Sequence, residues 1–126
     1  MSNEKKQELE IGVGMPQWLW INVFGRMVND AFGSYPYLVG SASRGKQWRD
    51  IDVRLILDDE KYEELFGMVD HPYQRTKKLN SLTMAFCELG RKLTGLPIDF
   101  QIQKQSIANR AFPHQERHAL IMDDYG

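Results

Sequence analysis

The sequence has little of several features that would assign it to a special class. A single cysteine, Cys87, excludes an intramolecular disulfide, and its place in a helical pattern favours a small core residue over a nucleophile. No apolar run is long enough to span a bilayer, and residues 1–10 are charged and polar, unlike a secretory signal. We therefore expect a protein of a reducing compartment, the cytoplasm, without a membrane partner.

The sequence also has no large excess of positive or negative charge. Sixteen basic and 17 acidic residues leave a net charge of −1, so no overall basic field favours a polymerase-like enzyme that grips a duplex. At 126 residues, with 42% hydrophobic and 26% charged residues, the chain suits one globular domain with its own core. We expect a flexible arm over 1–15, a core over about 17–103 and a C-terminal tail over 104–126.

What the sequence does contain is a turn between two β-prone runs, in residues 37–57, YLVGSASRGKQWRDIDVRLIL. Gly40 ends the first run where a residue without a Cβ lets the backbone pass close to a ligand, and Ser41 offers a hydroxyl. Backbone N–H groups of a turn can bind anionic oxygens. Three cations precede the second run: Arg44, Lys46 and Arg49. The turn therefore favours phosphate.

The second run carries carboxylates. Because side chains alternate along a strand, Asp50 and Asp52 share one face with Arg54, while the other face is apolar. The apolar residues are Ile51, Val53, Leu55 and Leu57. Two carboxylates about 7 Å apart at Cα suit Mg²⁺, which binds one or two carboxylates together with substrate phosphates. A phosphate-binding turn leading into this pair predicts a nucleoside triphosphate site.

A later run repeats this alternation. Over residues 97–102, Asp99 and Gln101 share one face and the opposite face is apolar, with Ile98, Phe100 and Ile102. Aspartate is depleted in strands, so Asp99 is either an exposed strand residue or a residue with a specific role, and we favour a metal ligand.

These residues together resemble the nucleotidyltransferases of the DNA polymerase β-like superfamily, in particular their minimal, single-domain bacterial members. The resemblance covers roughly residues 17–103, with a spacer shorter than in many relatives. It is carried by Gly40-Ser41, Arg44-Gly45, Asp50-Ile51-Asp52 and Asp99. It implies an α+β fold with a small mixed or antiparallel sheet and helices on one face. It also implies transfer of a nucleoside monophosphate from a triphosphate, ATP being expected, to an acceptor hydroxyl, with release of pyrophosphate.

The resemblance also implies roles for single residues. Two Mg²⁺ ions, or Mn²⁺ in their place, would be held by Asp50, Asp52 and Asp99. The nucleotide phosphates would be bound at Gly40, Ser41, Arg44, Gly45 and Lys46. Arg54 is expected either to orient the carboxylates and reach toward Asp99 and Gln101, or to form a plain surface ion pair. The acceptor stays open between a small molecule, a protein and tRNA.

Helices are predicted around these strands. The first lies between Pro16 and Gly33, with an apolar stripe of Trp20, Phe24, Met27 and Ala31 backed by Val23 and Val28. The acidic run Asp58-Asp59-Glu60 lies at the start of a short helix that ends at Gly67, and a longer helix ends at Gly95. His114 and His118 are spaced to share a helix face, and a surface helix is favoured over a metal site because no third ligand is evident.

Assembly with another chain is expected as well. An open catalytic sheet must be shielded from water, which predicts a homodimer or a complex with a helical partner protein. The alternative to an enzyme is a binding or antitoxin-like subunit of the same fold, with weak or no turnover. Three carboxylates on one face favour the enzyme, because their mutual repulsion is costly without bound cations.

Overall fold

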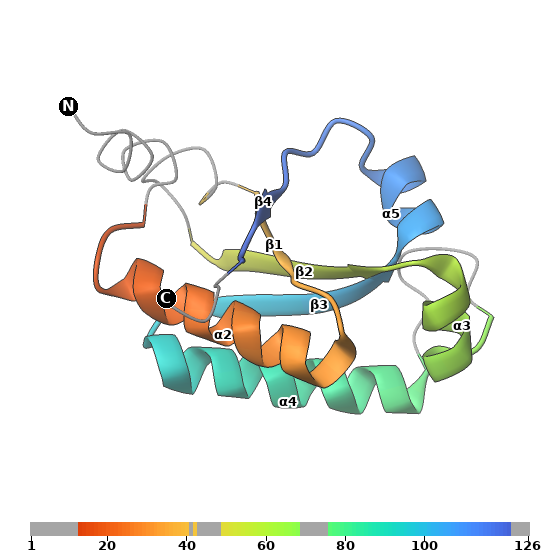
Figure 1. Ribbon diagram of the computed structural model, residues 1–126, viewed down its shortest axis with the longest axis horizontal. Coiled ribbons are helices and arrows are strands. Elements are labelled where there is room, and N and C mark those ends of the chain that lie inside the picture. The colour runs from red at the N-terminus through yellow and green to blue at the C-terminus, as the bar shows by residue number, and fades with distance from the viewer. Residues whose placement is uncertain (1–12, 41, 43–48, 69–75, 122–126) are drawn as a thin grey trace.

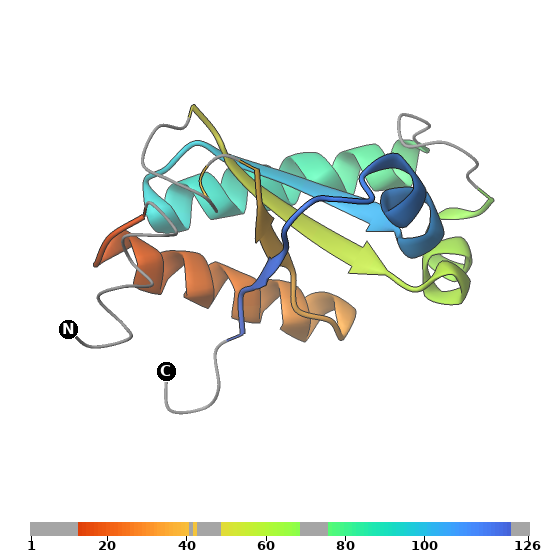
Figure 2. The same cartoon turned by 90° about the horizontal axis from the view of Figure 1, so that it is seen from above.

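The computed structural model describes residues 13–40, 42, 49–68 and 76–121, and Figures 1 and 2 show it from two directions. Its elements, in chain order, are α2 (Gln17–Phe32), β1 (Tyr37–Val39), β2 (Ile51–Leu57), α3 (Asp59–Phe66), α4 (Lys77–Thr94), β3 (Ile98–Lys104), α5 (Gln105–Ala111) and β4 (His118–Ala119).

The strands form one mixed sheet in the order β3-β2-β1-β4. β2 and β3 run parallel, and their register places Asp52 opposite Asp99 and Arg54 opposite Gln101. β1 is antiparallel to both β2 and β4. The expected α+β class with a small mixed sheet is therefore confirmed.

Helices α2 and α4 cover one face of this sheet (Figure 1). The side chains of β2 and β3 alternate between buried and half-buried positions along the whole of both strands. At the centre of the core, the ring of Phe100 contacts Phe24 of α2 and Phe86 of α4, with centroid distances of 5.7 and 5.6 Å. Burying a side chain of this size contributes about 1.5–3 kcal/mol. The apolar alternation predicted for both strands thus marks the core face.

The buried stripe of α2 differs from the predicted one. Trp20 and Met27 are 44% and 38% exposed. The core side of the helix carries Ile21, Phe24, Val28 and Phe32. Both sets repeat at helical spacing and share Phe24 and Val28, so periodicity alone did not separate them. The prediction placed the stripe about one residue out of phase, and part of the apolar surface of α2 faces outward.

The predicted helix ends are confirmed. Asp58 caps α3, because its carboxylate accepts a hydrogen bond from the backbone N–H of Lys61 at 2.8 Å. Gly33, Gly67 and Gly95 follow the last residues of α2, α3 and α4. Local capping signals were therefore read correctly from the sequence.

The outer edge of β3 is covered by side chains of α4. The Cys87 thiol accepts a hydrogen bond from the N–H of Phe100 and donates one to its carbonyl oxygen, both at 3.3 Å. Arg91 Nε donates to the carbonyl oxygen of Ile98 at 3.2 Å. An edge strand otherwise presents unpaired backbone groups, so these contacts protect it. Cys87 has the structural place expected for it.

The C-terminal region adds more to the fold than the tail expected there. Figures 1 and 2 show α5 on the side of the sheet away from α2 and α4. β4 then pairs with β1, with His118 opposite Leu38. Leu120 packs on α2 at Gly25, where a Cβ would lie 2.6 Å from the Leu120 carbonyl oxygen. The predicted surface helix containing His114 and His118 is wrong, since His118 belongs to a strand.

The structure describes only the last residues of the expected N-terminal arm. Residues 1–12 lie outside the described part of the chain. Val13, the first described residue of this arm, is 4% exposed and belongs to the core. In the described ranges, no helix combines the length and apolarity needed to cross a membrane.

Candidate active site

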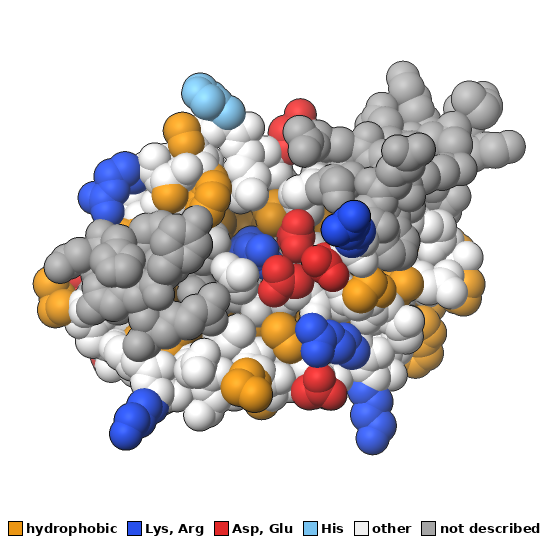
Figure 3. Space-filling model, turned by 180° about the vertical axis from the view of Figure 1, so that it is seen from behind, with side chains coloured by type: hydrophobic (Ala, Val, Ile, Leu, Met, Phe, Trp, Pro, Cys, Tyr) orange, Lys and Arg blue, Asp and Glu red, His pale blue; other side chains and the backbone are white. Residues whose placement is uncertain are grey.

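The carboxylates singled out in the sequence meet at one end of the parallel strand pair. Asp52 and Asp99 are the second residues of β2 and β3 and are paired in register. Their side chains are 27% and 38% exposed, which leaves both accessible. Asp50 is exposed and lies one residue before β2, where its charge still acts on Asp52. Figure 3 shows acidic side chains gathered on one face of the molecule beside a basic one.

The surroundings of Asp52 disfavour its negative charge. Burial is the main cause that raises the pKa of Asp52, and the neighbouring charge of Arg54 opposes it. The charges of Asp99 and Asp50 raise the pKa further. A cation placed between these carboxylates would relieve the unfavourable interactions.

Arg54 links the carboxylates. Its Nη2 lies 3.3 Å from Asp99 Oδ2 and 3.7 Å from Asp52 Oδ1. Its Nη1 donates to the carbonyl oxygens of Asp99 and Val53 at 2.6 and 3.2 Å. The side chain is only 12% exposed, so the alternative of a plain surface ion pair is wrong. Gln101, the other residue expected to support the site, is half-buried opposite Arg54 in the register.

Gly40 lies directly against this cluster. It follows β1 with a φ of +74°, in the left-handed region that favours glycine. A Cβ added here would overlap Oδ2 of Asp52. The predicted close approach of the backbone is therefore present, and the group beside it is the Asp52 carboxylate.

The remaining predicted phosphate-binding residues, Ser41, Arg44, Gly45 and Lys46, lie outside the described residues. Their roles stay predictions. Arg49, just before Asp50, is described and exposed.

The carboxylates of this site suit an Mg²⁺ ion that is bound together with substrate phosphates. Within the described ranges, no group of three or more His, Cys, Asp or Glu side chains is arranged to hold a metal ion by itself. Mg²⁺ is usually bound through one or two carboxylates plus substrate phosphates and water, and seldom by an all-protein cage. The adjacent oxygens of Asp52 and Asp99 provide that number of ligands, so the residues fit a cation that binds together with a phosphate-bearing substrate.

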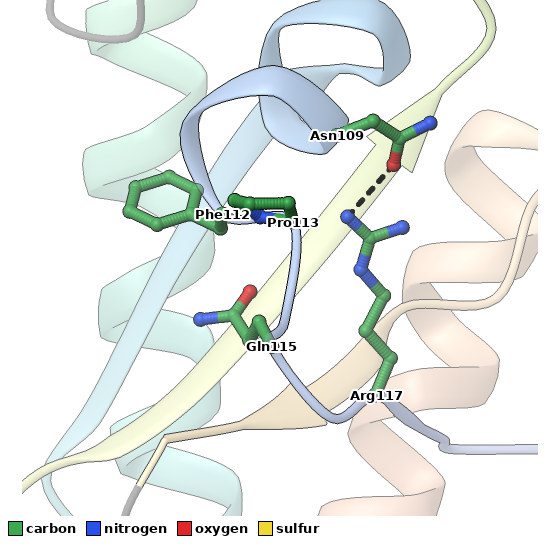
Figure 4. A pocket seen from close by; sticks show the side chains of 5 residues that line it. All are labelled: Asn109, Phe112, Pro113, Gln115 and Arg117. Atoms are coloured by element: carbon green, nitrogen blue, oxygen red, sulfur yellow. Dashed lines mark hydrogen bonds between the residues drawn. The ribbon is translucent and has the colours of Figure 1, made fainter.

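A pocket near the C-terminus is lined by residues for which the sequence predicted no role. Asn109, Phe112, Pro113, Gln115 and Arg117 line this pocket between α5 and β4 (Figure 4). The only sequence signal was an aromatic, two amides and an arginine in a short segment, and such a mixture is common in loops.

Comparisons with models of protein families, with curated proteins and with solved structures gave no match. The resemblance to nucleotidyltransferases thus rests on the sequence motifs alone.

Proposed function

We propose that this protein is a metal-dependent nucleotidyltransferase that moves a nucleoside monophosphate from a triphosphate, with ATP as the expected donor, to an acceptor hydroxyl. The carboxylate pair of Asp52 and Asp99, held at matching positions of two parallel strands with Asp50 beside it, supports this proposal. Accessible hard-oxygen ligands next to a turn rich in cations are what a divalent cation and a triphosphate require.

Each residue has a distinct task in this proposal. Asp52 and Asp99, with Asp50 beside them, would hold Mg²⁺ or Mn²⁺, which would supply positive charge to the phosphate oxygens and lower the pKa of the acceptor hydroxyl. Arg54 fixes the two strand carboxylates, because it contacts both and is itself held by two backbone carbonyl oxygens. The carboxylate of Asp99, the more exposed of the pair, takes the proton of the acceptor hydroxyl.

The turn after β1 binds the phosphates. Gly40 brings the backbone against Asp52, so a triphosphate on the turn that follows is beside the carboxylates. Ser41, Gly45 and the cations Arg44 and Lys46 provide the hydrogen-bond donors and charge that phosphate oxygens need. Pyrophosphate leaves from this turn.

A second candidate function is a subunit with weak or no turnover that works beside a partner protein. Arg54 favours it, because its guanidinium meets both strand carboxylates and already compensates part of their charge. In such a subunit the nucleotide would be bound but not transferred.

Incubation with triphosphates labelled on the α-phosphate, with Mg²⁺ or Mn²⁺, separates the two candidates. The acceptors offered are the protein itself, a co-purified partner protein, tRNA and small aminoalcohols. The variants Asp52→Asn and Asp99→Asn are compared with Asp30→Asn, which neutralises an exposed carboxylate of α2.

We expect label transfer and pyrophosphate release by the wild type and Asp30→Asn alone. Equal transfer by all variants would contradict the proposed site. If no protein transfers label, while calorimetry finds metal-dependent triphosphate binding that Asp52→Asn abolishes, the non-catalytic subunit is the better description.

A further inference from the structure

Part of the outward surface of helix α2 is apolar. Trp20, Val23 and Met27 follow one another at spacings of three and four residues, and Trp20 and Met27 are 44% and 38% exposed. Only two of the 16 residues of α2, Arg26 and Asp30, are charged. A surface helix normally carries polar residues opposite its buried stripe, whereas a helix that is apolar on most sides is covered by another element. α2 therefore presents a second apolar stripe that stays accessible.

Helix α4 continues this apolar surface. The two helices run antiparallel on the same face of the sheet (Figure 1), and the rings of Phe32 and Phe86 join them with a centroid distance of 5.3 Å. With about 3.6 residues per turn, the flank of α4 that carries Phe86 also carries Leu82, Ala85 and Leu89. Leu82 and Leu89 are half-buried and Ala85 is exposed. We call the combined surface the helix strip, which consists of Trp20, Val23, Met27, Leu82, Ala85 and Leu89.

The helix strip has a positive border. Lys78 and Lys92 are exposed and lie at the two ends of its α4 row, at the same alternating spacing. Glu88, the one acidic residue of α4, is paired with Arg91 at 3.1 Å. Lys78 also lies in the first turn of α4, where a cation opposes the helix dipole and no acidic residue compensates it. A partner with negative charge would relieve this arrangement.

These charges select among the partners that could cover the strip. A second copy of the chain would add the same two lysines and, on the outward side of its α2, the single carboxylate of Asp30. Anionic membranes attract clusters of about 4–8 Lys or Arg, more than this border offers. An amphipathic helix lays an apolar stripe on such a surface and supplies carboxylates from its flanks. Lys78 and Lys92 are roughly 21 Å apart along α4, the length of about four helical turns.

We propose that the helix strip is the docking site of an amphipathic helix of a partner protein, about four turns long, whose apolar stripe is flanked by carboxylates. Its apolar side chains pack on Trp20 and Met27, and its carboxylates meet Lys78 and Lys92. The aspartates of the candidate active site lie on the opposite face of the sheet. The partner therefore leaves them accessible, and the inference does not rest on the proposed function.

The test uses two synthetic peptides of about 16 residues. Both carry the same stripe of leucines at alternating spacings of three and four residues, flanked by Glu in one peptide and by Lys in the other. Each is titrated into the full chain by calorimetry at two salt concentrations. We expect saturable one-to-one binding of the Glu peptide, weakened by salt, and no binding of the Lys peptide. Equal binding of both peptides, or binding of neither, overturns the proposal.

Matched variants place the binding on the strip. Met27→Gln should weaken binding of the Glu peptide roughly 10-fold or more, whereas Met84→Gln, at an exposed methionine elsewhere on α4, should not. Lys78→Gln should weaken binding and reduce its salt dependence, whereas Lys77→Gln should do neither, because Lys77 points about 100° away around the helix. Losses of the same size in the Met84 or Lys77 variant would overturn the proposed surface.

Two further measurements identify a different occupant. In sedimentation of the chain alone, a dimer that Met27→Gln dissociates would mean that a second copy covers the strip. Binding to phosphatidylserine vesicles that Met27→Gln abolishes would mean that a membrane covers it. Either result overturns the proposal, and a monomer that does not bind the vesicles supports it.

Discussion

Two faces of the same strand pair, β2 and β3, have opposite properties. Toward α2 and α4 the strands present seven apolar side chains, none more than 5% exposed. These are Ile51, Val53, Leu55, Leu57, Ile98, Phe100 and Ile102. Toward the other side the same strands present half-buried polar and charged groups, among them Asp52, Arg54, Asp99, Gln101 and Gln103. The backbone geometry is shared, so the difference lies in the side chains alone.

The comparison indicates that apolar packing and charge are divided between the faces. The apolar face contributes burial and ring contacts, and its described side chains leave no buried polar atom without a hydrogen-bond partner. On the other face burial raises the pKa of Asp52, and Oε1 of Gln103 is buried with no hydrogen-bond partner among the described residues. Proteins retain such unfavourable groups where function requires them.

The largest effect on stability is expected from a substitution on the apolar face of β3. The neighbouring residue, on the charged face, serves as the comparison. Phe100→Ala should lower the free energy of unfolding by about 3–5 kcal/mol, because it empties the space between Phe24 and Phe86. Gln101→Ala should change it by no more than about 0.5 kcal/mol. Urea unfolding followed by circular dichroism measures both. Similar losses for the two variants would remove the distinction between the faces.

A second test weakens the charged face alone. Arg54→Met keeps the apolar stem but removes the guanidinium, so the carboxylates lose their common partner. We expect Mn²⁺ affinity to fall roughly 10- to 100-fold with little change in fold. Arg91→Met on α4 is the matched control, and calorimetry is the measurement. Intact Mn²⁺ affinity with only a lower melting temperature would make Arg54 a structural residue.

The division between faces was largely predictable, because it follows from alternation. Strict alternation in residues 51–57 and 98–102 identified both strands, their core faces and the side that carries the aspartates. Caps such as Asp58 were also readable, since they depend on neighbours within one turn. Features that depend only on residues close together in the sequence could therefore be predicted.

Features that depend on distant contacts were not predictable. α2 carries two stripes at helical spacing, and the choice of Ile21 over Trp20 is made by what packs against the helix. β4 is two residues long, and its pairing with β1 has no signal in its own sequence. The contact of Arg54 with Asp99 was expected as one alternative, but its burial, which excludes a surface ion pair, required the fold.

Gly40→Ala tests whether the contact between Gly40 and the Asp52 carboxylate matters for metal binding. Alanine at a positive φ costs about 1–2 kcal/mol. Gly95→Ala is the matched control, since Gly95 has a φ of +72° but no atom within 4 Å of its Cβ position. Both variants should lose similar stability in thermal unfolding. Only Gly40→Ala should also weaken Mn²⁺ binding, because its methyl group displaces the Asp52 carboxylate. Equal Mn²⁺ affinity in the two variants would separate Gly40 from the site.

The smallest expected effect on stability has the opposite sign. Asp52→Asn should increase the free energy of unfolding of the metal-free protein near neutral pH. Burial, together with the charges of Asp99 and Asp50, outweighs the attraction of Arg54 and raises the pKa of Asp52 above its ordinary value of 3.8. The ionised carboxylate is therefore less favourable in the folded chain than in water, and asparagine removes that charge.

The pH dependence tests this cause directly. The native state holds the proton of Asp52 more tightly than the unfolded chain, so its contribution to stability is fully present below about pH 3.8 and is lost as the pH rises through the folded-state pKa. In EDTA, the advantage of Asp52→Asn over the wild type should be largest near pH 7 and vanish at about pH 3. Melting temperatures at both pH values are the measurement. A less stable variant at neutral pH would mean that the ion pair with Arg54 outweighs burial. Millimolar Mg²⁺ should stabilise only the wild type, because the substitution removes a carboxylate that the proposed function assigns to the ion.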